Sequence, residues 1–435
     1  MMNSREKSIT IFLFCFFLAS VVFRSLVVQN ASVEKIAGGG GSSALTTTNG
    51  TNAATEPKYY PMSIHVVENV AQETEELLLK SREQIPKTFE NNFVDVDELL
   101  KKSAEVPNLE TDLPEEGQEE IDEDSHSNHR IVPFYWHVPR SGGGAISKLL
   151  GQCLELTLAS SSSIYKAGHN EQSKKIFEDH SDVLSIQWFD QSIFANVNLD
   201  GRAGLDRAAR LGIIQNNITY QDEDYSVDVL MSPSLHDVSN ILFEDAQIID
   251  GTKPRASMFA MFRRPIEREI SYFFHMKRHS DVEVIHAFEL PDWLQSDYYV
   301  GNIMTRTLVN KLNPNDQLTL DDLKAAKEIL RQKCIVGLLE KKAESWERFK
   351  YAYRMFWDKG SGNKAGRAPI PLNCESELWS YNWPNKNHYN IYSHSTQLGS
   401  VHAETIAVLT DSNQYDLNLY EYARYLFKDQ SKFFK

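Results

Sequence analysis

An arginine and a serine, Arg140 and Ser141, stand directly ahead of three glycines, Gly142, Gly143 and Gly144. The apolar run 131–138 before them predicts a buried strand, and the pattern from Ala145 to residue 158 predicts a helix. In a glycine-rich turn between a strand and a helix, backbone N–H groups point at the ligand and the helix dipole favours negative charge. Arg140 and Ser141 would add side-chain donors. We therefore expect residues 140–145 to bind an anionic group.

The loop differs from the common nucleotide-binding motifs. A triphosphate-binding P-loop requires G-x-x-x-x-G-K-[ST], and the residues before Lys148 do not supply its glycines. The dinucleotide-binding pattern G-x-G-x-x-G fails as well, because no third glycine follows at the required place. Both of these motifs are excluded.

A second stretch also combines a strand end with basic residues. The run 256–262 predicts a strand, and Arg263 and Arg264 follow it directly. Pro265 suits the first position of a helix, where its missing N–H group is not needed. Ser271 would lie about two turns, or roughly 11 Å, into that helix. Arg263 and Ser271 can therefore meet at one anion only if the strand end folds over the helix.

Together the two stretches resemble sulfotransferases that use 3′-phosphoadenosine 5′-phosphosulfate (PAPS). Residues 140–144 resemble that family's 5′-phosphosulfate-binding loop, and Arg263 with Ser271 resembles its 3′-phosphate-binding element. The segments 302–306, 336–340 and 419–423 are similar to Golgi-type sulfotransferases that act on polysaccharides, in particular the heparan-sulfate 2-O/6-O group. The similarity covers roughly residues 129–435, with a divergent middle and a poor match over 357–400.

The resemblance implies a fold, a reaction and partners. The fold would be an α/β three-layer sandwich with a central, mainly parallel sheet of the P-loop-like sulfotransferase type. The chain would transfer a sulfuryl group from PAPS to a carbohydrate hydroxyl in the Golgi lumen, without a metal and without nucleic acid as a partner. The cofactor-binding residues would be Arg140, Ser141, Gly142, Gly143, Gly144, Ala145, Arg263 and Ser271. The acceptor sugar, the position sulfated and the oligomeric state stay open.

One departure concerns catalysis, because many family members carry a lysine where this chain has Arg140. Arginine keeps its charge and binds anions in a bidentate manner, but it is not a geometric copy of lysine. We expect Arg140 to hold the anion. A general base must also take the proton of the acceptor hydroxyl. His169 is the candidate base, His180 and His236 are its rivals, and His137 is expected to support the loop.

The chain divides into four parts. Residues 1–8 predict a cytoplasmic tail, and the apolar run 9–28 predicts a transmembrane signal anchor of type II topology, with a cleaved signal peptide as the alternative. Residues 29–128 predict a flexible acidic luminal stem, and 129–435 the sulfotransferase domain. The formal charge of the chain is −15, and residues 55–125 hold 20 acidic and 6 basic side chains. The acidity therefore belongs to the predicted stem.

From residue 129 onward, strand and helix patterns alternate, which favours a parallel sheet covered by helices. Thr319 and Asp322 predict a capping box. The expected strands are 131–138, 183–189, 227–231, 256–262 and 334–338, and the expected helices are 145–158, 202–211, 265–278, 319–332 and 340–356.

Three further patterns have alternative interpretations. Cys153, Cys334 and Cys374 allow one disulfide and one free thiol, and have no metal-ligand spacing. Arg202, Arg207 and Arg210 would line a basic groove or form a solvated helix face. The Asp-x-Asp strings at 95–97 and 122–124, which a metal-dependent glycosyltransferase would use, lie in the predicted stem.

The alternative to an active transferase is a luminal protein on the same scaffold that binds glycans or nucleotides without catalysis. Arg140 and the divergent middle favour this alternative. The spacing of Arg263 and Ser271 argues against it.

Overall fold

The computed structural model describes residues 85–105, 130–161, 171–216, 218–220, 223–244, 253–357, 373–380 and 401–434. Their strands are β1 (Ile131–Trp136), β2 (Thr157–Ser160), β3 (Ile186–Phe189), β4 (Ser192–Asn198), β5 (Ile218–Tyr220), β6 (Glu223–Tyr225), β7 (Val229–Ser232), β8 (Arg255–Phe262) and β9 (Cys334–Leu338). The helices before α9 are α3 (Lys87–Asn92), α4 (Val96–Ala104), α5 (Gly143–Lys148), α6 (Glu171–Phe177), α7 (Gly201–Arg210) and α8 (Leu235–Asp237), with π-helical turns at Leu149–Cys153 and Val238–Glu244. The later helices are α9 (Pro265–His279), α10 (Glu283–Ala287), α11 (Leu290–Leu294), α12 (Ile303–Leu308), α13 (Leu320–Lys333), α14 (Lys342–Trp357), α15 (Cys374–Ser380), α17 (Ala403–Ser412) and α18 (Gln414–Gln430), with 3-10 turns at Leu339–Lys341 and Ser431–Phe433.

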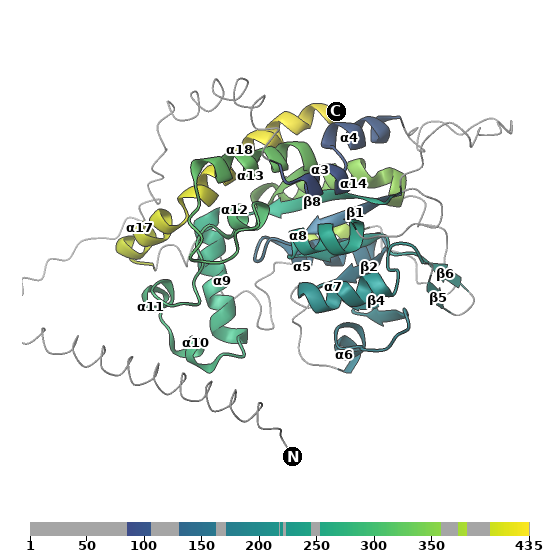
Figure 1. Cartoon of the computed structure of the whole chain (residues 1–435), viewed down its shortest axis with the longest axis horizontal. Coiled ribbons are helices and arrows are strands. Elements are labelled where there is room, and N and C mark those ends of the chain that lie inside the picture. The colour runs from purple at the N-terminus through teal and green to yellow at the C-terminus, as the bar shows by residue number, and fades with distance from the viewer. Residues whose placement is uncertain are drawn as a thin grey trace, which may run out of the picture. The chain divides into compact units, whose positions relative to one another are not determined.

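The centre of the fold is a seven-stranded sheet in the order β3-β4-β2-β7-β1-β8-β9 (Figure 1). All neighbouring strands in it are parallel except β3 and β4. β7 is the middle strand, and β1 lies next to it, paired with β7 on one side and with β8 on the other. The expected mainly parallel α/β sheet is therefore confirmed.

Alternate residues of the central strands face two separate cores. In β8, Met258 and Phe262 belong to one buried cluster, whereas Phe259 and Met261 belong to the other. Both faces of a parallel sheet are normally covered by helices, so its strands are apolar throughout rather than alternating. This is why 131–136 and 255–262 read in the sequence as continuous apolar runs.

Helices cover both faces of the sheet and give three layers. Apolar residues of α3, α7, α12, α13 and α18 belong to the first core, and those of α4, α5, α6 and α14 belong to the second. α9, α10, α11 and α17 form a third, smaller cluster around Phe273 and Trp293 (Figure 1). The capping box that Thr319 and Asp322 predict begins α13, where each side chain accepts a hydrogen bond from the backbone of the other residue.

Two expectations for the middle of the chain are wrong. The helix predicted over 145–158 begins at Gly143 and continues only to Cys153, and β2 begins at Thr157. β4 follows β3 after a two-residue turn and was not expected. Its buried Asn196 conceals the strand pattern, because a polar side chain there depends on distant partners such as the carbonyl of Val183, 2.9 Å away.

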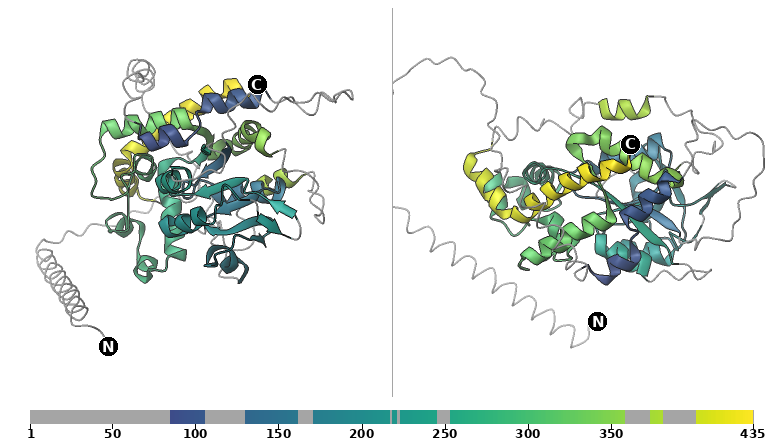
Figure 2. Two further views of the ribbon diagram at one scale, coloured as in Figure 1. Left: turned by 45° about the vertical axis from the view of Figure 1, so that its right-hand side comes forward. Right: turned by 90° about the horizontal axis from the view of Figure 1, so that it is seen from above.

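The predicted stem boundary at 129 lies too late in the chain. α3 and α4 are packed into the folded body, with Phe89 and Phe93 fully buried. Phe93 forms a parallel bridge with Ala256 of β8, and the Val94 N–H group donates to the Ala256 carbonyl at 2.8 Å. Figure 2 shows α4 (dark blue) beside the C-terminal end of α18 (yellow). Residues 85–104 therefore belong to the globular part and not to a flexible stem.

Residues 1–84, and with them the expected cytoplasmic tail, the anchor over 9–28 and the first half of the stem, lie outside the described residues. None of the helices that the structure does describe combines the length and the apolar character needed to span a membrane.

A disulfide closes the second core. Cys153, at the end of the helical run after the glycine loop, is bonded to Cys374 of α15. Cys334 at the start of β9 is a buried free thiol. The sequence allowed one disulfide and one free thiol but did not identify the pair. The cross-link ties α15 to the helix that carries the glycine loop.

We predict that Phe93→Ala lowers the free energy of unfolding by about 3 kcal/mol, because it removes a fully buried ring and leaves a cavity. Lys101→Ala, on the exposed face of α4, is the control and should change it by less than about 0.5 kcal/mol. Urea denaturation followed by circular dichroism measures both. Equal stability of the two variants would show that this segment is not part of the folded body.

Candidate functional site

The sheet order changes direction at the carboxyl end of β1. From β1 the chain passes through α5 to β2, on the side of β7, and α5 packs in the second core. From β8, on the other side of β1, it passes to β9 through helices that include α13, which packs in the first core. Connections that leave neighbouring strands on opposite faces form a topological switch point, where α/β sheets bind ligands. Both stretches that the sequence predicts to bind anions follow strands that end at this point.

Two glycines are required by the shape of the loop. Gly142 has φ of +98°, and a Cβ atom there would lie 2.9 Å from Leu339 Cδ1. A Cβ atom on Gly143 would lie 2.3 Å from the His137 ring, so the backbone of the loop rests directly on this imidazole. His137 supports the loop as expected, and burial lowers its pKa to about 4, which keeps the ring neutral. The N–H groups of Gly143 and Gly144 begin α5 and have no acceptor within the helix.

The structure brings Arg140, Arg263 and Ser271 together. Arg140 Nε donates a hydrogen bond to Ser271 Oγ at 3.2 Å, and Arg263 Nη1 donates to the Arg140 carbonyl at 3.2 Å. Arg140 has φ of +65°, in the left-handed region that a non-glycine residue rarely occupies. The loop after β1 and the first turns of α9 therefore form one cluster.

The cluster holds more positive charge than its surroundings neutralise. Burial lowers the pKa of Arg140, and the nearby Arg278 lowers it further. Burial also lowers the pKa of Arg263 to about 10, with Arg140 and Arg268 adding to the effect. Glu267 opposes this shift, its carboxylate lying 3.7 Å from Arg263 Nε. Among the residues that the structure describes, no carboxylate forms an ion pair with Arg140.

A buried hydroxyl beside this charge lacks a hydrogen bond. Ser141 is fully buried, and its Oγ has no partner in the described part of the chain. An unsatisfied buried hydroxyl costs about 1–3 kcal/mol. A bound oxyanion would satisfy Ser141 and reduce the repulsion among the arginines. The arrangement is therefore suited to a ligand with more than one negative charge.

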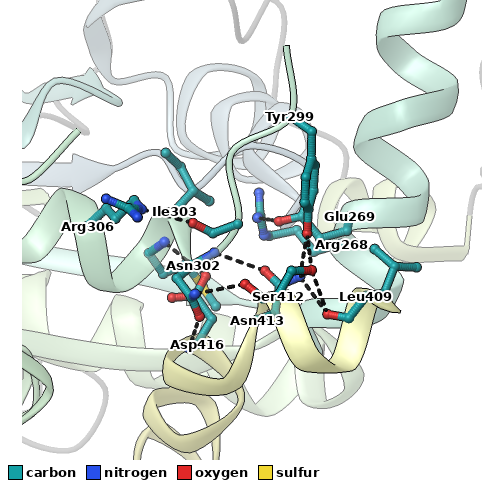
Figure 3. A network of polar contacts seen from close by, with 12 residues as sticks. Arg268, Glu269, Tyr299, Asn302, Ile303, Arg306, Leu409, Ser412, Asn413 and Asp416 are labelled. Atoms are coloured by element: carbon teal, nitrogen blue, oxygen red, sulfur yellow. Dashed lines mark hydrogen bonds and ion pairs between the residues drawn. The ribbon is translucent and has the colours of Figure 1, made fainter. Parts of the chain in front are cut away.

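A buried polar network lies beside the helix that carries Ser271. Arg268 and Glu269 of α9 form an ion pair and are both about 2% exposed. Beside them, the Tyr299 hydroxyl lies 2.8 Å from Ser412 Oγ and accepts from Asn413 Nδ2 at 2.7 Å (Figure 3).

The same network extends to the start of α12. The buried Asp416 carboxylate of α18 accepts hydrogen bonds from the N–H groups of Met304 and Thr305 at 3.0 and 2.8 Å. Asp416 thereby caps α12 from another helix, and hydrogen bonds join α12, α17 and α18 beside the Arg268–Glu269 pair of α9.

No sequence motif assigned a role to Arg268, Glu269 or Asp416. Arg268 lies between Arg263 and Ser271, inside the second stretch expected to bind anions. This position could have identified Arg268 from the sequence. The pKa of Glu269 is raised in part by Asp416, which is distant in the sequence.

The structure describes two of the three candidate general bases. His169 lies outside the described residues. His236 is a structural residue, because its buried ring contacts the Leu308 carbonyl through Nε2 at 3.0 Å and packs edge-on against Phe89. His180 is exposed ahead of β3, at the sheet edge remote from β8.

The helix with three arginines does not form a basic groove. Arg202 and Arg210 pair with Asp206 and Asp182, and the buried Arg207 donates to the carbonyl of Ser181 at 2.8 Å. These charges are locally neutralised and stabilise the fold around β4.

The first Asp-x-Asp string lies in the folded body rather than in a stem. Asp95 precedes α4 as its N-cap and forms an ion pair with the buried Lys333 at 2.6 Å. In the part of the chain that the structure describes, no group of three or more His, Cys, Asp or Glu side chains is arranged to hold a metal ion.

We predict a pH dependence of stability from Glu269. Burial raises its pKa to about 7, despite the adjacent Arg268. Between its ordinary value of 4.5 and about 7, only the folded state binds this proton, so the contribution of Glu269 to the free energy of unfolding falls as pH rises. Glu269→Gln lacks this titration. The free energy of unfolding of the wild type minus that of Glu269→Gln should therefore be larger at pH 5 than at pH 8.

Urea denaturation across this pH range checks the prediction, with Glu283→Gln on the exposed part of α10 as the control for the substitution itself. A difference that stays constant with pH would mean that Glu269 is ionised throughout.

No model of a known protein family and no curated protein matches this chain. What the site binds is therefore inferred from its own residues. Two arginines, a serine and an unsatisfied hydroxyl meet where two strands end, on a loop whose backbone requires glycine. This is a candidate binding site for a polyanionic ligand.

Proposed function

We propose that the protein is a sulfotransferase that moves the sulfuryl group of PAPS to a hydroxyl of a carbohydrate acceptor. The observation that carries the proposal is the hydrogen-bonded contact of Arg140 with Ser271 and of Arg263 with the Arg140 backbone. PAPS carries phosphates at both the 5′ and the 3′ positions of one ribose. Two anion-binding elements that touch each other suit a ligand of this kind. The mostly parallel sheet is compatible with a P-loop-like sulfotransferase fold.

Each element has a separate role in this proposal. The N–H groups of Gly142, Gly143 and Gly144, with the Ser141 hydroxyl, would hold the 5′-phosphosulfate. The Ala145 N–H group, which the sequence also assigned to this role, already donates to the Gly142 carbonyl at 3.0 Å. Arg263 and Ser271 would hold the 3′-phosphate. Arg140 lies between the two elements and would contact the 5′ side while its Nε keeps Ser271 in place.

The reaction is an in-line displacement at sulfur. The acceptor hydroxyl oxygen forms a bond to sulfur as the bond from sulfur to the 5′-phosphate oxygen breaks. Negative charge develops on the departing phosphate, where the fixed charge of Arg140 and the loop N–H groups would stabilise it. A base takes the proton of the acceptor hydroxyl, and His169 remains our candidate for this role. Arginine in place of the more common lysine would bind the charge but not donate a proton.

We also propose the cellular setting that the sequence indicates. An uncleaved anchor at 9–28 would place the protein in the Golgi membrane as a single-pass type II protein with its catalytic part in the lumen. The Cys153–Cys374 disulfide supports a lumenal location, because disulfides persist in oxidising compartments.

The alternative is a lumenal protein that binds nucleotide or glycan without transferring sulfate. Arg140 in place of lysine favours it. Transfer of radiolabelled sulfate from PAPS to a panel of polysaccharides distinguishes the two. Nucleotide binding without any transfer would support the alternative.

We predict that Arg263→Ala weakens the binding of adenosine 3′,5′-bisphosphate about 10- to 100-fold, because a hydrogen bond to a charged group contributes about 1.5–3 kcal/mol. Arg264→Ala is the matched control. Arg264 is the next residue, and its side chain is 53% exposed against 5% for Arg263. Isothermal titration calorimetry measures both affinities.

Ser271→Ala keeps the test valid if Arg263→Ala does not fold, because it removes one hydroxyl and little volume. It should weaken binding in the same direction. If Arg263→Ala and Ser271→Ala both bind the nucleotide like the wild type, the 3′-phosphate assignment is wrong.

A further inference from the structure

The buried charges beside α9 do not balance. Arg268 and Glu269 are each 2% exposed and Asp416 is fully buried, so one guanidinium stands against two carboxyl groups (Figure 3). Arg268 interacts electrostatically with both of them. Two ionised carboxylates with a single cation leave a net negative charge out of water, which is costly. We therefore expect one of the two carboxyl groups to bind a proton near neutral pH.

Hydrogen bonds identify Glu269 as the group that takes up this proton. Asp416 accepts three hydrogen bonds, from the N–H groups of Met304 and Thr305 and from the Thr305 hydroxyl, at 3.0, 2.8 and 2.8 Å. Each of these donors favours the ionised form of Asp416. In the described part of the chain, the Glu269 carboxyl has one hydrogen bond, from Arg268. Burial raises the pKa of both carboxyl groups, to about 7 for Glu269, and the donors of α12 oppose this shift at Asp416.

The other ionisable groups around Glu269 keep their charge state near neutral pH. Tyr272 of α9 and Tyr299, which precedes α12, interact electrostatically with Glu269. Burial raises the pKa of both phenols, that of Tyr299 to about 12, so both stay neutral. Arg306 of α12 is always charged, and its guanidinium donates to backbone carbonyls of the segment 301–316, such as that of Asp316 at 2.9 Å. The charge of the cluster therefore changes through Glu269.

The neighbouring helices add neutral groups or distant charges. Ser412, the last residue of α17, reaches the cluster through its hydroxyl, which lies 2.8 Å from the Tyr299 hydroxyl. The charged residues that α10 and α11 bring to α9 meet it about two turns beyond Glu269, where Lys277 forms an ion pair with Glu289 at 2.9 Å.

Arg268 connects Glu269 electrostatically to the anion cluster. It lies three residues before Ser271, so the two side chains are neighbours on one face of α9. The charge of Arg268 also lowers the pKa of Arg263, so it acts at the anion cluster itself. An ionised Glu269 neutralises Arg268, whereas a protonated Glu269 leaves more of its positive charge to act on Arg263. The positive potential at the anion cluster therefore rises when Glu269 binds a proton.

We infer that Glu269 makes anion binding at Arg140, Arg263 and Ser271 depend on pH, with tighter binding when Glu269 is protonated. By linkage, a bound anion favours the protonated form, so binding takes up protons near neutral pH. The application to a nucleotide rests on the proposed function, whereas the coupling to an anion does not. The site would hold its ligand more tightly in a mildly acidic compartment than in a neutral one.

The test is isothermal titration calorimetry of the full chain in detergent with adenosine 3′,5′-bisphosphate, at pH 5.5 and at pH 8.5. Glu269→Gln resembles the protonated side chain at both pH values. The wild type should bind the nucleotide like Glu269→Gln at pH 5.5 and about threefold more weakly at pH 8.5, because one additional negative charge then acts on the ligand through a partly screened medium. The comparison cancels the titration of the ligand's own phosphates, which is the same for both proteins.

Glu283→Gln, the same substitution at an exposed residue of α10, is the matched control and should follow the wild type at both pH values. Glu269→Met also lacks the carboxyl group and repeats the test if Glu269→Gln does not fold. A ratio of affinities between the wild type and the Glu269 variant that is the same at pH 5.5 and pH 8.5 would overturn the inference.

Sulfate is the second probe, because it is a divalent anion that does not titrate in this pH range. Its binding is measured as the rise in unfolding temperature that it causes. An effect of pH on sulfate binding that Glu269→Gln removes, in a protein that binds no nucleotide, would keep the coupling and remove the proposed function. Nucleotide binding with the same pH dependence in the wild type and Glu269→Gln would keep the proposed function and overturn the coupling.

Discussion

The structure depends on the burial of like charges at the carboxyl ends of two neighbouring strands. Arg140 follows β1, Arg263 follows β8, and both are largely removed from water. Burying a cation is costly unless it gains hydrogen bonds and an opposite charge. The protein supplies the hydrogen bonds through Ser271 and the Arg140 carbonyl. It supplies only part of the opposite charge, through Glu267. A polyanionic ligand would supply the remaining negative charge and stabilise the site.

Several parts of the fold position these two arginines relative to each other. The parallel pairing of β1 with β8 brings both strand ends to one edge of the sheet. On one side, the His137 ring leaves no room for a side chain at Gly143, and the positive φ of Gly142 favours glycine there. On the other side, the buried Arg268 and Glu269 of α9 lie beside a polar network that reaches to the C-terminal helix through Asp416. Residues remote in sequence therefore determine where Ser271 stands.

The sequence predicted those parts of the structure whose causes are local. Continuous apolar runs identified β1 and β8, because both faces of these strands are buried. The two stretches expected to bind anions were chosen by composition and position, and the structure brings them into contact through Arg140 and Ser271. The capping box of α13 was found in the same way, since Thr319 and Asp322 are three residues apart.

The features that the sequence did not reveal depend on distant partners. β4 was missed because its Asn196 is stabilised by the Val183 carbonyl across a turn. Residues 85–104 were assigned to the stem because acidic composition outweighed the two aromatic residues Phe89 and Phe93, both of which are fully buried. To predict the disulfide partner of Cys153 and the surroundings of Glu269, one must know which remote segments meet.

The most direct measurement is a calorimetric comparison of adenosine 3′,5′-bisphosphate with adenosine 5′-monophosphate on the wild-type chain. The two ligands differ only in the 3′-phosphate. If the loop and α9 together form one nucleotide site, the bisphosphate binds at least about tenfold more tightly, because Arg263 and Ser271 contact the additional phosphate. Equal affinities, or no binding of either ligand by folded protein, would contradict the account.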